Sequence, residues 1–445
     1  MSEYRDLLKI AEEVLKETSL CDRCFGRLFA KLGHGWNNKV RGEALKRVVL
    51  MRVHERLRRG DASAENDLRK IAPNVGEIAK GVYLQVFGEE LKTSECVICG
   101  SIIEEFLERV SKDVASVVKA HNAPSFLIGV ICDKNVLKRE EEITSKYGID
   151  FWESIKREIK REIGKRVQQM TSAVPDFKHP ALTLIVKFPE GSLEIAPSSM
   201  LIKGRYWKTG RMISQAFWPT VNGPKYFSIE EAASGVLALT RGDSVVVHAS
   251  GREDVDVRVL GSGRPLIIEI KAPSVWVEDL EAIEKALNST ATEVVKFKVE
   301  GFAESKNVIR VYKEELAIKG KTYRALIYVE GGVREEDMRT LEERFANRTI
   351  LQRTPKRVLK RKKDMVRTKL VESVKCKILT SNLIECLIRA SGGLYVKELV
   401  SGDDGRTTPS FSEALGRRAF CIELDVLEVS VNPKPLEAQG LAEKP

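Results

Sequence analysis

Residues 251–258, Gly-Arg-Glu-Asp-Val-Asp-Val-Arg, place three carboxylates and two guanidiniums in one short segment. The segment follows an apolar run at 245–247 and precedes an expected turn at 261–263, after which a strand is expected to begin at Leu266. Charged groups between buried strands are costly unless they are paired or used. This segment is therefore the first candidate for chemistry.

Two kinds of chemistry fit these carboxylates. If residues 254–258 are extended, Asp254 and Asp256 share one face and Glu253 points to the other. Paired carboxylates on one face suit Mg²⁺ and phosphoryl chemistry. Alternatively, one carboxylate acts as a nucleophile or base while nearby cations keep it ionised.

Four of the eight cysteines form two Cys-x-x-Cys pairs, Cys21 with Cys24 and Cys96 with Cys99. Two such pairs can complete a closed tetrahedral zinc site, which here would join two distant segments. A redox dithiol and buried free thiols are the alternatives. The other four cysteines lack partner spacing and are predicted to be core residues, since disulfides are not expected in the cytosol.

Two segments are predicted to face a nucleic acid. Residues 353–367 hold eight cations against the single acid Asp364, a block that binds polyanions well, although a solvated surface is the plainer interpretation. Residues 204–211 combine Tyr206 and Trp207 with cations between glycines. Rings that stack and cations that meet phosphate suit a nucleic-acid loop, and an ordinary turn fits equally well.

The elements that must position these residues are predicted from apolar periodicity. Helices are expected at 4–16, 41–70, 229–239, 280–287 and 335–347, with a further helix capped by Asp150 and extending to Val167. Strands are expected at 181–188, 193–202, 293–299, 323–329, 374–379, 393–400 and 421–431. Because helices and strands do not alternate strictly, the fold class is predicted to be α+β.

Composition limits the class of protein. A chain of 445 residues with 43% apolar and 31% charged residues predicts two or three globular domains. No apolar run is long enough to cross a bilayer, and residues 1–9 do not resemble a secretory signal, so a cytoplasmic location is expected. The net charge of +10 matters mainly through the block at 353–367.

Three motifs, in order, resemble those of pseudouridine synthases. Residues 251–257 resemble the motif with the essential aspartate, although Asp256 stands where distant members have glycine. Residues 321–326 resemble the motif that supplies the active-site tyrosine, and 393–400 resemble the one that supplies a lysine or arginine and an apolar residue two positions on. With 352–359, 401–409 and the upstream cysteines, the chain is most similar to the archaeal and eukaryotic tRNA pseudouridine synthases with an N-terminal THUMP domain.

This resemblance implies the domain organisation and the substrate. A zinc-binding, THUMP-containing RNA-binding region is expected at 1–215, and a catalytic domain with a mixed or antiparallel sheet at 220–435. The implied activity is isomerisation of uridines 54 and 55 in the TψC arm of tRNA. It needs no cofactor for catalysis, and we expect a monomer that binds tRNA and no membrane. Residues 204–211 would contact the acceptor end.

The resemblance also implies residue roles. Asp254 would be the catalytic nucleophile, and Lys397 would pair with it and hold it ionised at neutral pH. Tyr323 would stack on the flipped base, and Leu399 would form an apolar floor. Arg252, Arg357 and Tyr395 are further substrate-binding candidates, and Cys21, Cys24, Cys96 and Cys99 are the metal ligands.

Two other functions compete with the isomerase. A metal-dependent RNA nuclease would use Glu253, Asp254 and Asp256, and it would cleave the strand and stop in EDTA. A noncatalytic tRNA-binding protein would keep every activity after Asp254→Asn. A THUMP-containing methyltransferase is disfavoured, because Gly261-Ser262-Gly263 is not surrounded by a βαβ unit.

Overall fold

The computed structural model describes residues 6–429 except 222, 250, 319 and 361, and the side chains of 313–318 are also left out of the description. The chain divides into two compact units, Met1–Ser198 and Ser199–Pro445. The division falls before the expected boundary near 215, because strand β5 (Met200–Lys208) pairs with β9 and β10 of the second unit.

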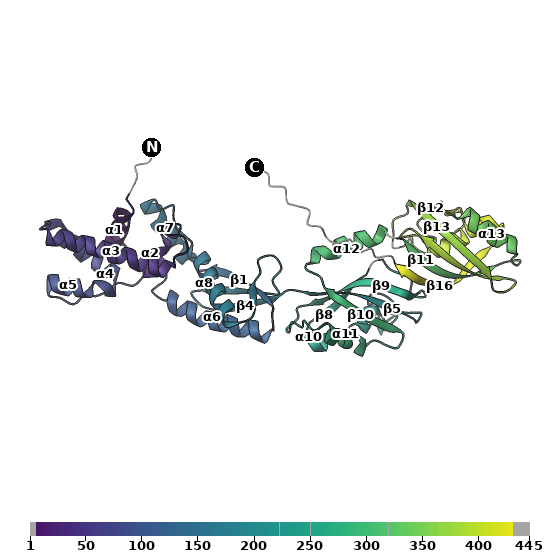
Figure 1. The fold of residues 1–445 in the computed structure, drawn as a ribbon, viewed down its shortest axis with the longest axis horizontal. Coiled ribbons are helices and arrows are strands. Elements are labelled where there is room, and N and C mark those ends of the chain that lie inside the picture. The colour runs from purple at the N-terminus through teal and green to yellow at the C-terminus, as the bar shows by residue number, and fades with distance from the viewer. Residues whose placement is uncertain (1–5, 222, 250, 319, 361, 430–445) are drawn as a thin grey trace, which may run out of the picture. The chain divides into compact units, whose positions relative to one another are not determined.

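The first unit begins with helices and continues as a helix-and-sheet region (Figure 1). Its helices are α1 (Leu7–Glu17), α2 (Asp22–Arg27), α3 (Asn38–Arg58), α4 (Ala62–Val75), α5 (Lys80–Phe87), α6 (Ile103–Ala120), α7 (Lys134–Tyr147) and α8 (Ile155–Met170). A four-stranded sheet has the order β2-β1-β3-β4, formed by Val174–Pro175, Ser125–Cys132, Leu182–Phe188 and Leu193–Pro197.

Helix α8 starts later than predicted. Ser154, and not Asp150, caps it, with the Ser154 hydroxyl accepting a hydrogen bond from the Arg157 backbone N–H. The predicted apolar face is nonetheless present, since Ile155, Ile159, Ile163 and Val167 are all buried. The prediction of the core face was thus correct, while the cap was misplaced.

The second unit is built on a ten-stranded sheet in the order β10-β5-β9-β16-β11-β14-β13-β12-β15, with β8 paired to β9. The strands not yet defined are β8 (Ser244–Ala249), β9 (Arg258–Lys271), β10 (Val295–Phe302), β11 (Lys321–Val329), β12 (Arg348–Arg353), β13 (Val366–Ile378), β14 (Leu383–Ala390), β15 (Thr407–Thr408) and β16 (Ala419–Val429). All pairs in this sheet are antiparallel except β16 with β9, which confirms a mixed sheet.

The helices of the second unit pack on two apolar cores. One core lies around β5, β9 and β10 with α9 (Ile229–Ala232), α10 (Val236–Thr240) and α11 (Leu280–Ser289). The other lies around β11, β14 and β16 with α13 (Glu335–Arg344), α14 (Val396–Ser401) and α15 (Phe411–Leu415). Helix α12 (Lys306–Ile318), the 3₁₀ turns Glu77–Ala79 and Lys356–Val358, and the short pair β6 (Pro219–Thr220) and β7 (Gly223–Pro224) complete the described elements.

Two predictions around residues 204 and 261 were wrong. Residues 204–208 are not a loop but part of strand β5, where Tyr206 is fully buried. The expected turn at 261–263 lies within the continuous strand β9. Its glycines serve close approach, since a Cβ on Gly261 would lie 2.0 Å from the Leu427 carbonyl oxygen.

The strand predicted at 393–400 is also wrong. Gly393, with a φ of +81°, follows the end of β14, and helix α14 begins after Tyr395. The helix predicted at 229–239 divides into α9 and α10. In addition, Cys376 and Cys386 form a disulfide between the paired strands β13 and β14, where free core cysteines were expected.

Candidate active site

The charged segment at 251–258 forms a turn and is not extended. The Val257 backbone N–H donates to the Asp254 carbonyl at 3.0 Å, and strand β9 begins only at Arg258. The buried ammonium of Lys208 supports this turn by donating to the carbonyl oxygens of Ile213, at 3.0 Å, and Asp254, at 3.4 Å. The predicted division of the three carboxylates between two strand faces therefore does not apply, and each carboxylate has its own cationic partner.

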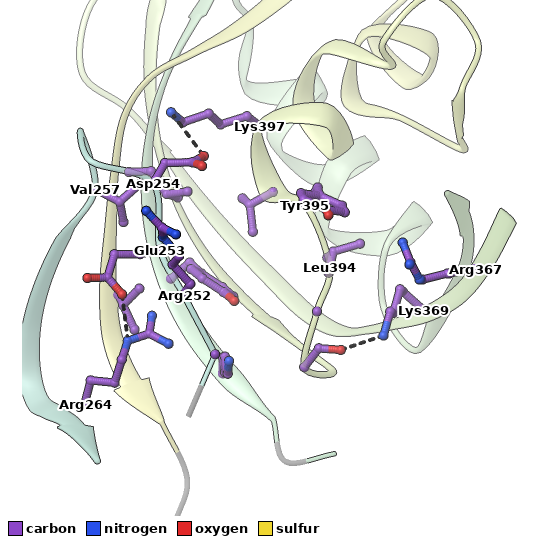
Figure 2. Close-up of a pocket in the computed structure, with 18 of the residues that line it drawn as sticks. Arg252, Glu253, Asp254, Val257, Arg264, Arg367, Lys369, Leu394, Tyr395 and Lys397 are labelled. Carbon is purple, nitrogen blue, oxygen red and sulfur yellow. Dashed lines mark hydrogen bonds and ion pairs between the residues drawn. The ribbon is translucent and has the colours of Figure 1, made fainter. Parts of the chain in front are cut away.

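Glu253 is buried beneath the turn and does not point away from the site. Its carboxylate lies 3.0 Å from Nε of Arg264 (Figure 2). It also lies 3.5 Å from Nζ of Lys208 and accepts a hydrogen bond from the Tyr206 hydroxyl at 2.8 Å. Burial alone would raise the pKa of Glu253, but Arg264 and Lys208 hold it below its usual value. This carboxylate anchors the turn.

Asp254 is 38% exposed and faces the pocket. Nη1 of Arg357 lies 3.0 Å from its Oδ1 and 2.9 Å from its Oδ2, whereas Nζ of Lys397 lies 3.7 Å away. The closer partner of Lys397 is Asp256, at 2.6 Å. The expected ion pair of Lys397 with Asp254 is therefore present, but Arg357 makes the tighter contact with Asp254, and Lys397 lies closer to Asp256.

Asp256, considered above only as a metal ligand, holds Lys397 beside Asp254. Burial would raise the pKa of Asp256, but the hydrogen bond from Lys397 keeps it below its usual value. Arg357 is fixed in a similar way, because its Nε donates to Glu398 of α14 at 2.6 Å. Burial opposes the charged form of Arg357, but Glu398 and Asp254 raise its pKa.

These groups line a pocket of about 390 Å³. Arg252, Tyr323, Arg357, Tyr395 and Lys397 all line it, so the structure brings most of the predicted site residues together (Figure 2). Leu399 does not line it, because this side chain is fully buried in the core of the second unit. The apolar lining comes instead from Val257, Leu394, Val396, Leu424 and Val426.

Several pocket residues were missed from the sequence. Lys321 lies two positions before Tyr323 on the inward face of β11, so strand alternation would have placed the two together. Arg264, Arg367 and Lys369 come from strands whose position beside the motifs depends on the sheet order, and no local pattern indicates it.

The four cysteines of the two pairs lie together in the first unit. Their sulfur atoms are all within 4.8 Å of one another, and the sulfurs of Cys21 and Cys99 are 3.6 Å apart. Four thiols at this separation fit a closed structural metal site. Cys21 also caps helix α2, which fixes the first pair at a helix start.

Buried ion pairs surround helix α2. Arg23 is paired with Glu104 at 2.5 Å and with Glu158 at 2.6 Å. Arg27 is paired with Glu140 of α7, and all these side chains except Glu104 are buried. Both guanidiniums of α2 are therefore neutralised by carboxylates of the same unit.

Comparisons with known proteins find relatives over most of the chain. The family model described as "Pus10, C-terminal" matches residues 201–430, and the archaeal Pus10 THUMP domain matches 110–187. Proteins named tRNA pseudouridine synthase Pus10 are 46% identical in Aeropyrum pernix, over 95% of this chain and 97% of the relative, and 42% identical in Ignisphaera aggregans, over 95% and 99%. A chain in a solved structure of a Cbf5–Nop10–Gar1 complex matches over 51% of this chain and 47% of its own length, at 16% identity and a TM-score of 0.28.

The matched domains and the sheet define a protein of the pseudouridine synthase class, preceded by a THUMP domain. More particularly, the chain belongs to the Pus10 family. The resemblance inferred from the three motifs is thereby confirmed. Within the part of the chain that the structure describes, no helix is long and apolar enough to span a membrane.

Proposed function

We propose that this protein isomerises uridine to pseudouridine in tRNA, with uridines 54 and 55 of the TψC arm as its targets. The observation that carries the proposal is the position of Asp254 in the wall of the pocket, contacted by Arg357 and facing the same cavity as Tyr323. The names of the similar proteins support the tRNA substrate.

The reaction breaks the bond between N1 of the base and C1′ of the ribose, and it forms a bond between C5 and C1′. The proton lost from C5 balances the proton gained at N1, so no external co-reactant is required. In this proposal Asp254 acts at the ribose, either as a nucleophile or by stabilising positive charge. Arg357 and Lys397 set its position while the base turns.

The target base must leave the RNA stack, which costs a few kcal/mol. Tyr323 offers a ring for stacking, and Leu394 and Val426 supply the apolar contact first assigned to Leu399. Arg252 also lines the pocket, where it would contact the RNA backbone or fill the space that the flipped base leaves in the stack. Tyr395 accepts a hydrogen bond from Lys362 at 3.0 Å and extends the aromatic lining.

The remaining surface would bind the tRNA body. The THUMP domain at 110–187 and the basic block at 353–367 are the proposed contacts. Lys356 pairs with Asp404, and Arg357 is held by Asp254 and Glu398, so both are less available to phosphate than predicted. Lys360 and Lys363 are exposed and better placed for that role, while Arg361 lies outside the described residues.

We assign zinc to the four-cysteine cluster, because four thiolates are its preferred structural ligands. Its role would be to join the start of α2 to the segment before α6. The competing nuclease is disfavoured, since Glu253, Asp254 and Asp256 each face a cation and do not share a metal position.

The test incubates the full chain with an unmodified tRNA transcript and maps pseudouridine along it. Matched transcripts with cytidine at 54, at 55 or at both identify the targets. Pseudouridine at 54 and 55, with the strand intact and no need for added Mg²⁺, is the expected result. Tight binding without pseudouridine would support the noncatalytic alternative and overturn the proposal.

A further inference from the structure

A second group of cations lies in the pocket, separate from those around Asp254. Lys321 begins strand β11 and Lys369 lies on β13, and both line the cavity. Lys321 is 7% exposed, so the residue as a whole is buried and borders on the cavity. The motifs assign no role to either residue.

The ammonium of Lys321 has no acceptor of its own. Among the residues that the structure describes, no carboxylate or carbonyl oxygen lies within hydrogen-bonding distance of its Nζ. The nearby Glu253 is already paired with Arg264, and Lys369 donates only to the Gly392 carbonyl, at 2.7 Å. Burial and Arg264, with a smaller contribution from Lys369, lower the pKa of Lys321 to about 8, although Glu253 opposes the shift.

The backbone around these two ammoniums leaves room for a ligand. Lys321 and Val371 both pair with Ala390, so a small side chain stands between the two lysine-bearing strands. A Cβ on Gly251 would lie 3.0 Å from Nζ of Lys321, and a Cβ on Gly393 would lie 3.0 Å from Nζ of Lys369. Both glycines have a positive φ, so larger residues are excluded from both walls.

A buried cation without a partner is expensive, and an anionic ligand would compensate it. Lysine is a common phosphate ligand, because its ammonium acts as a compact point charge. Tyr323 lies two residues beyond Lys321 on the same face of β11, about 6.6 Å along the strand. One strand could thus hold a base and a phosphate of the same nucleotide.

We propose that Lys321 and Lys369 bind a phosphodiester of the target nucleotide, while Tyr323 contacts its base. Arg367, at the rim of the same strand β13, adds positive charge toward the incoming backbone. This subsite rests on the proposed function, because it takes the ligand to be a nucleotide of the RNA substrate. A site for free inorganic phosphate would share the same chemistry.

The test compares Lys321→Met and Lys369→Met with Lys377→Met, an exposed control on the same strand β13 outside the pocket. Each pocket variant is expected to bind the tRNA transcript about tenfold more weakly, as for loss of one charged hydrogen bond, and the control to bind it like the wild type. The same proteins are then measured on transcripts with one methylphosphonate linkage, placed either 5′ or 3′ to the target uridine. For one of these neutral linkages, the wild type should lose at least as much affinity as either substitution causes, and each variant should lose less than the wild type, because one of its two lysine contacts is already gone.

The proposal would be overturned if the lysine substitutions weakened tRNA binding equally on the charged and the neutral linkages. It would also be overturned if they did not weaken binding at all. Thermal stabilisation by inorganic phosphate that disappears in Lys321→Met, with no effect of either methylphosphonate, would also overturn it in favour of a free-phosphate site. Misfolding is controlled by thermal unfolding without RNA, where Lys321→Met should be at least as stable as the wild type, because it removes an uncompensated buried charge. These experiments measure tRNA affinity and do not require turnover. A failure to form pseudouridine would therefore count against the proposed function, while the affinities would still test the phosphate subsite.

Discussion

Buried charges are treated differently in the two units. In the first unit, the guanidiniums of Arg23 and Arg27 are both matched by carboxylates, Glu158 and Glu140 among them, next to the four-cysteine cluster. In the second unit, Glu253 is shared by Arg264 and Lys208, while Lys321 has no partner among the described residues. In the first arrangement each guanidinium meets carboxylates of the same unit, whereas the second keeps an excess of positive charge that faces a cavity.

The difference indicates what each region does. A closed network in which each guanidinium meets a carboxylate of the same unit needs no anionic ligand and serves to fix helices α2, α7 and α8. An unbalanced set of cations in a pocket is complete only when an anion is bound. On this view the charge balance separates a structural centre from a substrate site.

The largest effect is expected at the cysteine cluster. Cys24→Ser removes one of the four ligands, and because structural zinc contributes on the order of 10 kcal/mol, the first unit should lose its cooperative unfolding transition. Zinc content and circular dichroism check this. Cys132→Ser, which alters a buried thiol outside the cluster, is the control and should keep the metal. Equal damage from both changes would show that burial and not ligation matters there.

Breaking the closed network should be the next largest effect. Glu140→Gln leaves Arg27 buried without its carboxylate, which should lower the free energy of unfolding by about 3–5 kcal/mol in urea titration. Glu142→Gln, an exposed position on the same helix α7, should change it by less than about 0.5 kcal/mol. A small loss at Glu140 would remove the contrast between the two units.

In the second unit, substitutions of Glu253 and Lys321 should have coupled effects on stability. Glu253→Gln adds to the uncompensated positive charge and should lower the free energy of unfolding. The loss should be smaller when Lys321→Met has already removed one cation. A double-mutant cycle by chemical unfolding should give a coupling free energy of about 1–2 kcal/mol. Strict additivity of the two substitutions would mean that Lys321 and Glu253 do not interact.

A smaller effect is expected from pH. Lys321 is protonated below about 8, so tRNA affinity should be greatest there and should fall as the pH rises through that value. The groups that face it are Arg264, Glu253, Lys369 and Tyr323, and a bound phosphate would shift the fall to higher pH. The loss should be at most about tenfold and absent in Lys321→Met. A parallel pH dependence in both proteins would assign the titration to another group.

Residue spacing in the sequence correctly predicted the cysteine cluster and several helices and strands. The cysteine pairs were correctly expected to lie together, and the apolar face of α8 and the strand at Leu182–Phe188 follow from simple periodicity. Glycines were the main source of error. Gly261 and Gly263 allow two strands to approach closely, whereas Gly393 does belong to a turn, and the sequence around them does not distinguish these uses.

Residues of the candidate site could be predicted only where each lies within a recognisable motif. Asp254, Tyr323 and Lys397 were chosen from their motifs, and all three line one pocket. The partners were not predicted, because the contacts of Arg357 with Asp254 and of Lys397 with Asp256 depend on how a turn and a short helix meet in space. Lys369 is placed by sheet order alone, which no pattern within its own strand encodes.

The central claim is that Asp254, and not its neighbour Asp256, acts on the target nucleotide. Single-turnover formation of pseudouridine in an unmodified tRNA tests it directly, with Asp254→Asn and Asp256→Asn compared at saturating protein. We expect Asp254→Asn to bind the tRNA but to lose at least about 10³-fold in rate, whereas Asp256→Asn, which only frees Lys397, should lose about tenfold. An Asp254→Asn protein that keeps its rate within about tenfold of the wild type, or an equal loss in both variants, would contradict it.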